Sequence, residues 1–237
     1  MKKILLGVLS LGLSFMLIGC SSKTKEIDEY KIKTSDEVRA GLKQIKDDKG
    51  FFLDSVHKSI SYKENPDGTD RITEYSTIYG AKNDYYYFVV DGITSYYDLT
   101  NDDYYVNYTY SDNTWYKSIT YYSLLGYDKA EQEDRLLGRI VHSFNNVRLG
   151  NYNWKYYETT KYDRNVIKGV AKGTIKEADY EVEYDDCFYI DETGLILSYE
   201  HEVLLDGTQF FNSSTGFNEM LILNSFLTEY EIELPNV

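Results

Sequence analysis

The sequence predicts an α+β fold, an antiparallel β-sheet accompanied by an N-terminal helix and a central helix. Two observations predict it. Strand-like runs separated by turn residues occupy two regions of the chain, and the stretch between them, residues 128–146, has its apolar residues at helical spacing. A further capped amphipathic run precedes the first β region. Residues 34–237 are of a length that suits one domain with a sizeable core.

The N-terminal helix is predicted over residues 35–48. Thr34 and Glu37 form a capping-box pattern, in which the Thr side chain accepts a backbone N–H and the Glu side chain reaches back to the cap. Apolar residues then recur on one helical face and a glycine closes the run, at Val38, Leu42, Ile45 and Gly50.

The first β region is predicted as a meander of short antiparallel strands. Asp91-Gly92 is its best hairpin signal, because both residues tolerate the positive φ that a two-residue turn requires. Asn65, Asp67 and Asp70 could cup a calcium ion, but the spacing of a calcium-binding EF-hand loop is absent, so a plain turn is favoured. The predicted strands are residues 51–63, 71–79, 84–90, 93–99, 104–110 and 114–120.

The central helix carries its acids in the first turns, as the helix dipole favours. Its predicted apolar face consists of Leu136, Leu137, Ile140, Val141 and Phe144. Residues 121–127 lead into it as a loop or a short helix. The second β region follows, with strands at about residues 152–162, 166–176, 179–190, 195–205 and 208–212, and a last piece near 218–235.

Alternation along the strands suggests which tyrosines face inward. Successive strand residues point to opposite faces, so a Tyr-Tyr pair places one ring inside and one outside. Tyr96 and Tyr105 are predicted to face outward. The predicted inward-facing residues, candidates for lining a ligand site beneath the central helix, are Tyr97, Tyr104, Val106, Tyr108, Val182 and Tyr184. The inward side could be a cavity or a fully packed core, since native interiors leave few voids.

The N-terminus predicts an exported, lipid-anchored protein. Lys2 and Lys3 precede an uncharged run, residues 4–19, that is short for a membrane-spanning helix and typical of a signal peptide. The run ends in Leu-Ile-Gly-Cys, which resembles the bacterial lipobox. That resemblance implies cleavage after Gly19 and diacylation of the Cys20 sulfur, which would anchor the chain to the outer face of the cytoplasmic membrane, or to the outer membrane of a Gram-negative source. Residues 20–33 are predicted to be the lipidated cysteine and a polar tether.

Charge and reactive residues narrow the function classes. The chain is acidic, with a net charge of −14, so nucleic acid is excluded as a partner. Cys187 is the cysteine left after Cys20, which excludes a disulfide within the mature chain and predicts a packed structural thiol. His57, His142 and His201 are expected to be structural or surface residues, and paired acids such as Asp185-Asp186 to be turns or solvated faces. No nucleophile, metal or cofactor motif occurs, so we expect a non-enzymatic protein without cofactor or metal.

The order of elements resembles that of the LolA/LppX-like superfamily of bacterial lipid-handling proteins. Local likenesses lie in YYDLTNDDYYVNYTYSDNTWYK around Trp115, in FYIDETGLILSYEHE with Gly194, and in the closing YEIELPNV with Pro235. The resemblance implies a strongly curved, incomplete antiparallel barrel with helices packed on its concave face. It also implies a hydrophobic cavity between helices and sheet.

Two functions from different classes are compatible with the sequence. The first is a binding module for an apolar or amphiphilic small molecule or lipid, held inside the curved sheet. The second is a surface interaction protein that binds glycan, peptide or another envelope protein through outward-facing tyrosines such as Tyr96 and Tyr105, because aromatic rings serve as anchors at interfaces. The strand at residues 84–90, apolar on both faces, favours the first.

Overall fold

The computed structural model describes residues 24–65, 67–146, 152–176, 181–206 and 216–236. The predicted lipid-attachment residue Cys20 and the predicted strand at 208–212 lie outside the described residues. Within them, no helix is both long enough and apolar enough to cross a membrane.

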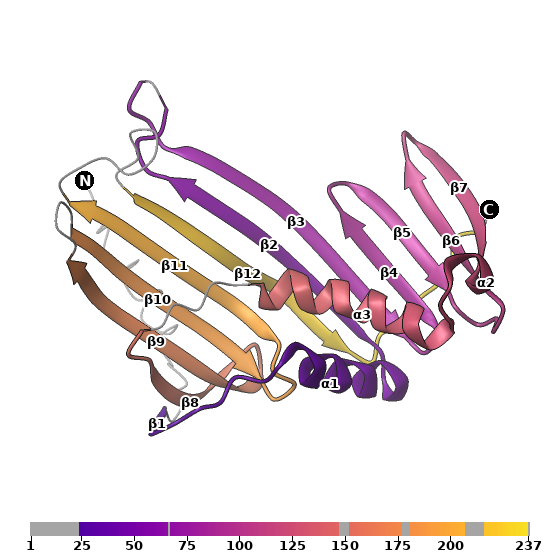
Figure 1. The fold of residues 1–237 in the computed structure, drawn as a ribbon, viewed down its shortest axis with the longest axis horizontal. Coiled ribbons are helices and arrows are strands. Elements are labelled where there is room, and N and C mark those ends of the chain that lie inside the picture. The colour runs from indigo at the N-terminus through magenta and orange to yellow at the C-terminus, as the bar shows by residue number, and fades with distance from the viewer. Residues whose placement is uncertain (1–23, 66, 147–151, 177–180, 207–215, 237) are drawn as a thin grey trace, which may run out of the picture.

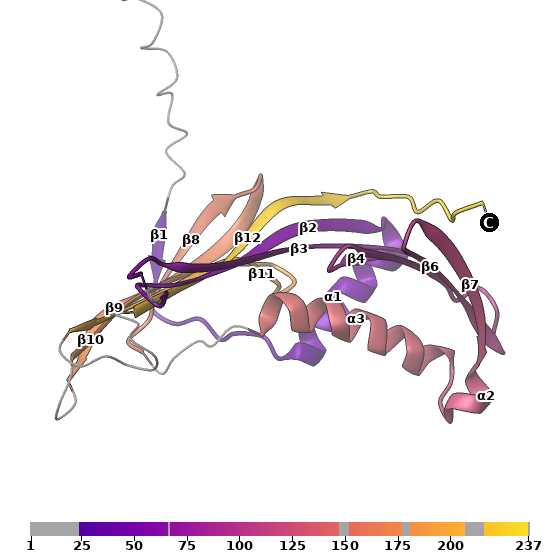
Figure 2. The ribbon, with the colours of Figure 1, turned by 90° about the horizontal axis from the view of Figure 1, so that it is seen from above.

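The described strands form one antiparallel sheet in the order β1-β8-β9-β10-β11-β12-β2-β3-β4-β5-β6-β7 (Figure 1). Figure 2 shows that the sheet is curved but not closed into a barrel, and that α1 and α3 lie on its concave side. This confirms the predicted α+β class. The strands are β1 Lys25–Ile27, β2 Phe51–Ser61, β3 Arg71–Lys82, β4 Tyr85–Val90, β5 Ile93–Asp98, β6 Tyr104–Ser111, β7 Thr114–Tyr121, β8 Lys155–Lys161, β9 Arg164–Lys176, β10 Glu181–Asp191, β11 Ile196–Asp206 and β12 Gly216–Thr228.

The two β regions join in the middle of the sheet. β12, the last strand of the second region, pairs with β2, the first strand of the first region, from Phe217 opposite Ser61 to Thr228 opposite Phe51. The other strands follow one another as hairpins outward from this centre, except for β1, which comes from the start of the chain and pairs with β8. Both meanders therefore belong to one continuous sheet.

The helices are α1 Ser35–Asp48, α2 Tyr122–Leu125 and α3 Lys129–Asn145. The predicted capping box at α1 is present, with Glu37 N–H donating to the Thr34 hydroxyl and Thr34 N–H donating to the Glu37 carboxylate at 2.7 Å. Asp128 caps α3 by accepting from Glu131 N–H at 2.9 Å. Both helix starts are thus determined by local side chains.

The concave side beneath the helices is a packed core. The predicted apolar face of α3 is buried, and Phe144 makes an edge-on contact with Tyr79 of β3, whose ring also meets Phe88 of β4. The helices are tied together by Lys46 of α1, which is only 1% exposed and donates to Glu133 of α3 and to the carbonyl oxygen of Asn83. Under α1 and α3 the chain therefore fills its own interior.

The N-terminal segment differs from the expected free tether. Lys25–Ile27 pairs with β8 as β1, and Tyr30 and Ile32 pack against the core. Lys33 donates to the carbonyl oxygen of Glu192. Apolar residues at positions 30 and 32, the β1–β8 ladder and the Lys33 hydrogen bond together hold this mostly charged stretch against the sheet.

The pairing of β5 with β6 corrects the predicted facing of several tyrosines. Tyr97 lies opposite Tyr86, whose hydroxyl reaches Glu133 of α3, so Tyr97 faces the helices as predicted. Tyr97 also lies opposite Asn107, which places Tyr105 on the helix side and Tyr108 on the convex side opposite Tyr96. The prediction that Tyr104, Val106 and Tyr108 face inward is therefore wrong, as is the outward prediction for Tyr105. A one-residue change of register exchanges the two faces of a strand, and the turn at residues 99–103 sets that register.

Candidate ligand-binding pocket

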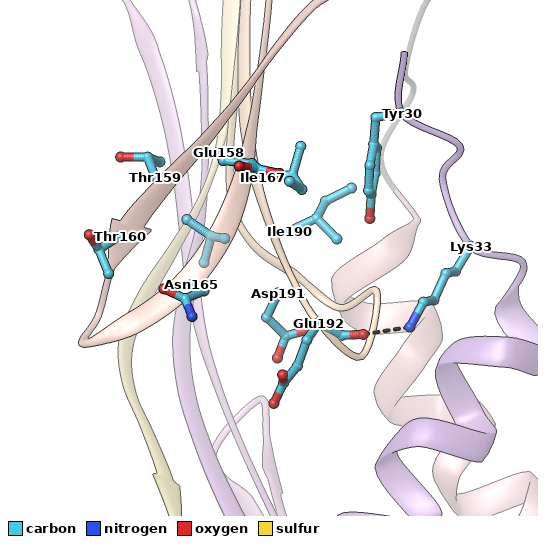
Figure 3. A pocket seen from close by; sticks show the side chains of 11 residues that line it. Tyr30, Lys33, Glu158, Thr159, Thr160, Asn165, Ile167, Ile190, Asp191 and Glu192 are labelled. Carbon is cyan, nitrogen blue, oxygen red and sulfur yellow. Dashed lines mark hydrogen bonds between the residues drawn. The ribbon is translucent and has the colours of Figure 1, made fainter. Parts of the chain in front are cut away.

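A pocket of about 910 Å³ lies where the N-terminal segment passes over the ends of β8, β9 and β10 (Figure 3). Its volume is in the range of small-molecule sites, about 300–1,000 Å³. Residues from all four segments line it: Tyr30, Lys33, Glu158, Thr159, Thr160, Asn165, Val166, Ile167, Ile190, Asp191 and Glu192. The N-terminal segment is therefore one wall of the pocket and the sheet is the other.

The inner part of this pocket is apolar. Ile190 is fully buried and lies opposite the half-buried Ile167 in the β9–β10 ladder. Figure 3 shows the Tyr30 ring across the space from Ile190 and Ile167. Tyr30 is held by its contact with Tyr156, whose ring centre is 5.7 Å away. Two isoleucines and an aromatic ring give a surface suited to a hydrocarbon chain.

Polar groups lie at the rim. Asp191 begins the β10–β11 turn, and its Oδ1 accepts from the Thr193 N–H and hydroxyl and from the Leu195 N–H. Its Oδ2 is buried without a hydrogen-bond partner within the described part of the chain. Burial raises the pKa of Asp191, and burial together with the Asp191 charge raises the pKa of Tyr30. The site thus combines an apolar wall with a carboxyl group whose pKa is raised by burial.

The described residues contain no group of three or more His, Cys, Asp and Glu side chains that could hold a metal ion. In the turn at Asn65 and Asp67, weighed as a calcium site, Asp67 Oδ1 accepts from Thr69 N–H at 3.0 Å, and the Asn65 side-chain N–H groups donate to the Thr69 hydroxyl and the Asp70 carbonyl oxygen.

The six residues predicted to line a site do not line this pocket. Tyr97 packs against the core beside Phe88, and Tyr104, Val106 and Tyr108 lie on the convex face. Val182 and Tyr184 share the predicted strand face with Phe188, and Tyr184 stacks on Tyr152 with ring centres 4.0 Å apart. Contact of any of these residues with a ligand stays a prediction.

Sequence reasoning missed Tyr30 and Asp191 as site residues. Tyr30 belongs to the stretch that was predicted to be a tether. Its two-residue spacing from Ile32, which places both side chains on one face of an extended segment, was the available signal. Asp191 was read as a hairpin turn residue, which is correct, and its burial follows from the turn folding against Lys33 and α1. Neither residue carries a motif, because a pocket made where distant segments meet leaves no local pattern.

A second buried polar group lies elsewhere on the sheet. Asp186 of β10 is fully buried and hydrogen-bonded to Nδ1 of His201 on β11, directly opposite in register. The expectation that Asp186 lies in a turn or on a solvated face is wrong, whereas the expectation of a hydrogen-bonded structural His201 is confirmed. Cys187 follows as a half-buried free thiol, whose pKa is raised by burial. A thiol with a raised pKa is a poor nucleophile at neutral pH.

Comparison with known proteins gives little. No family model matches this chain, and no curated protein does either. A solved structure to which it is similar is a DUF1329 family protein from Desulfovibrio piger, at 10% sequence identity, over 85% of this chain and 95% of that one, with a TM-score of 0.25. A TM-score this low supports no conclusion about fold or function.

Proposed function

We propose that this chain is a membrane-anchored lipoprotein whose domain binds an apolar or amphiphilic ligand in the pocket under Tyr30. The observation that carries the proposal is the juxtaposition of Ile167, Ile190 and the Tyr30 ring around about 910 Å³ of space. A hydrocarbon chain placed there would remove the exposed parts of Ile167 and Tyr30 from water, at about 25 cal/mol for each Å² of apolar area buried. Lys33 and Asp191 at the rim would face a polar head group.

The proposed lipid anchor suits this site. Cys20 precedes Lys25, the first residue of β1, by five positions. Even fully extended, that length spans no more than about 18 Å. An acylated Cys20 would therefore hold the β1–β8 end of the sheet, and the pocket beside it, close to the bilayer from which an amphiphilic ligand would come.

Titration of the full chain with a fluorescent fatty-acid analogue tests the binding proposal. We expect saturable binding by the parent protein. Ile167→Trp should weaken it at least tenfold, because the indole fills the space between β9 and Tyr30. Ile72→Trp, at a residue that is 59% exposed on β3, is the matched control and should bind as the parent does. Absence of saturable binding to the parent contradicts the function, and equal binding by the two variants contradicts the site.

Anchoring is tested separately. Cys20→Ala should abolish partition of the chain into the detergent phase and block removal of residues 1–19. A mature-sized variant that still enters the detergent phase would contradict lipidation at Cys20.

A specific observation also favours a second candidate function, binding of a glycan, peptide or envelope protein. On the convex side Trp115 lies between Tyr96 and Tyr110, with ring centres 5.8 and 5.1 Å away. These rings are partly exposed and could stack on a partner. Loss of partner capture by Trp115→Ala, with fatty-acid binding unchanged, would support it.

A further inference from the structure

β7 is the terminal strand of the sheet at the end opposite β1 (Figure 1). Within the described residues it pairs with β6 alone, over its full eight residues. The strand contains no proline. Along its outer edge, no described strand accepts or donates the backbone hydrogen bonds. Such an edge is a template for another strand unless charge, proline or a bulge protects it.

The side chains around this edge are unusually apolar for an exposed surface. Lys117 is the one charged residue of β7. Leu124 of the short helix α2 is 79% exposed, and further large apolar side chains are exposed in the same stretch of chain: Tyr116, Ile119, Tyr121 and Leu125. Ile119 and Tyr121 lie on the convex face and Tyr116 on the opposite face, so both faces of this free edge carry exposed apolar side chains, as interaction surfaces do.

We propose that this edge binds a second copy of the same chain, β7 against β7 in antiparallel orientation about a two-fold axis. The sheet would then continue from one copy into the other. Paired residues must lie on the same face for the convex side to stay continuous, and this permits only registers in which the two paired residue numbers are both odd or both even.

Charge and ladder length select one of these registers. With Lys117 on the axis, the two lysines would face each other directly, and opposed like charges destabilise a strand pair. With Ile119 on the axis, only residues 117–121 would pair. With Ser118 on the axis, residues 115–121 pair, no like charges meet, and Trp115 of each copy faces Tyr121 of the other.

This register also covers the exposed residues beyond the strand. Because α2 follows Tyr121 directly, the β6–β7 turn of one copy comes beside α2 of the other. Leu124 and Leu125 would then lie beside the second copy, in addition to the backbone ladder. A standard protein–protein interface buries about 800 Å² per partner. A single strand pair with α2 beside it would bury less, so we expect a concentration-dependent dimer.

Cysteine cross-linking of the full chain, purified in detergent, tests the register. Directly opposed residues of an antiparallel pair have Cβ atoms within about 5.5 Å, near enough for a disulfide after a small adjustment. Ser118→Cys should therefore form a reducible dimer on oxidation. Thr120→Cys, the matched control on the same face of the same strand, keeps Lys117 and lies opposite Tyr116 of the other copy in this register, so it should remain at the background level of the parent, which retains Cys187. Equal cross-linking of both variants, or of neither, would overturn the proposal.

Sedimentation velocity gives an independent readout. The parent should shift from monomer to dimer as its concentration rises, whereas Ile119→Lys should remain monomeric because it adds charge to the edge. Ile72→Lys on β3 should dimerise as the parent does. A parent that is monomeric throughout, or an Ile119→Lys variant that dimerises equally, contradicts edge pairing.

Discussion

The concave side of the sheet is covered in two different ways. Beneath α1 and α3, side chains such as Phe144, Ile140 and Tyr86 are completely buried and belong to one apolar cluster. At the pocket by the ends of β8–β10, the cover is an extended segment that contributes Tyr30 and Lys33, and space remains. A helix presents a wide apolar stripe, whereas an extended segment presents alternate side chains only. The difference in cover explains why one region is a core and the other is a candidate site.

Truncation in the packed region should have the largest effect. Phe144→Ala removes a fully buried ring between α3 and β3, so the free energy of unfolding should fall by about 4 kcal/mol. Tyr30→Ala, beside existing space, should cost less than about 2 kcal/mol. Urea denaturation of both variants measures the contrast, and equal losses would remove the distinction between core and pocket.

The buried ion pair between the helices should come next. Glu133→Gln leaves the buried Lys46 with Asp47 and the Asn83 carbonyl, and should reduce the free energy of unfolding by about 3 kcal/mol at neutral pH. Burial raises the pKa of Glu133, but hydrogen bonds from Lys43 and Lys46 outweigh it, so the pKa is lowered overall.

A lowered carboxyl pKa determines how this contribution depends on pH. The contribution is fully present above the unfolded-state value of 4.5 and is lost as pH falls through the folded-state value below it. The parent should therefore be more stable than Glu133→Gln by a smaller free energy of unfolding in acid than at neutral pH. Urea denaturation midpoints of the two proteins, measured across the pH range, check this. A difference that is constant from neutral pH into strong acid would show that the carboxylate charge contributes nothing.

Smaller losses of stability are expected on β5 and β6, where the two faces of the sheet can be compared. Tyr97 packs beside Phe88 under Arg139 of α3, so Tyr97→Ala should cost about 2 kcal/mol. Tyr104, on the convex face with Tyr121 as its aromatic neighbour, should cost less than about 1 kcal/mol when replaced by Ala. Thermal or urea unfolding of both variants measures the two losses. A larger loss for Tyr104→Ala than for Tyr97→Ala would support the sequence-based prediction that Tyr104 faces inward.

The smallest effect is expected at the pocket rim. Burial raises the pKa of Asp191, so its ionised form costs stability above the raised value, and this cost disappears below the unfolded value of 3.8. Asp191→Asn keeps an oxygen for the Thr193 and Leu195 donors, and should change the free energy of unfolding by less than about 1 kcal/mol at neutral pH. A large destabilisation would show that the charge is required where burial disfavours it.

Much of the fold could be predicted because its signals are local. The capping box at Thr34 and the turn at Asp91-Gly92 are where the sequence predicts them, and the central helix is within a residue at each end. These features depend on neighbours in the chain. The facing of Tyr104 and Tyr105 was predicted wrongly because register depends on how a five-residue turn folds, which alternation alone does not reveal.

The candidate site could not be predicted for a related reason. Tyr30 and Ile167 are far apart in the sequence, and each looks ordinary in its own segment. Their proximity follows from β1 pairing with β8, a contact between the start of the domain and its second meander.

The burial of Asp186 was missed for a different reason. Its polar side chain was assigned to a solvated face, although it shares one face of β10 with Tyr184 and Phe188 and pairs with His201 on the next strand.

A crystal structure of the full chain with a brominated fatty acid would test the central claim most directly, because bromine is located by its anomalous scattering. The account predicts a bromine peak between the Tyr30 ring and the side chains of Ile167 and Ile190, with α1 and α3 unmoved. A peak between α3 and the sheet, or a crystal at saturating ligand with no peak beside Tyr30, would contradict it.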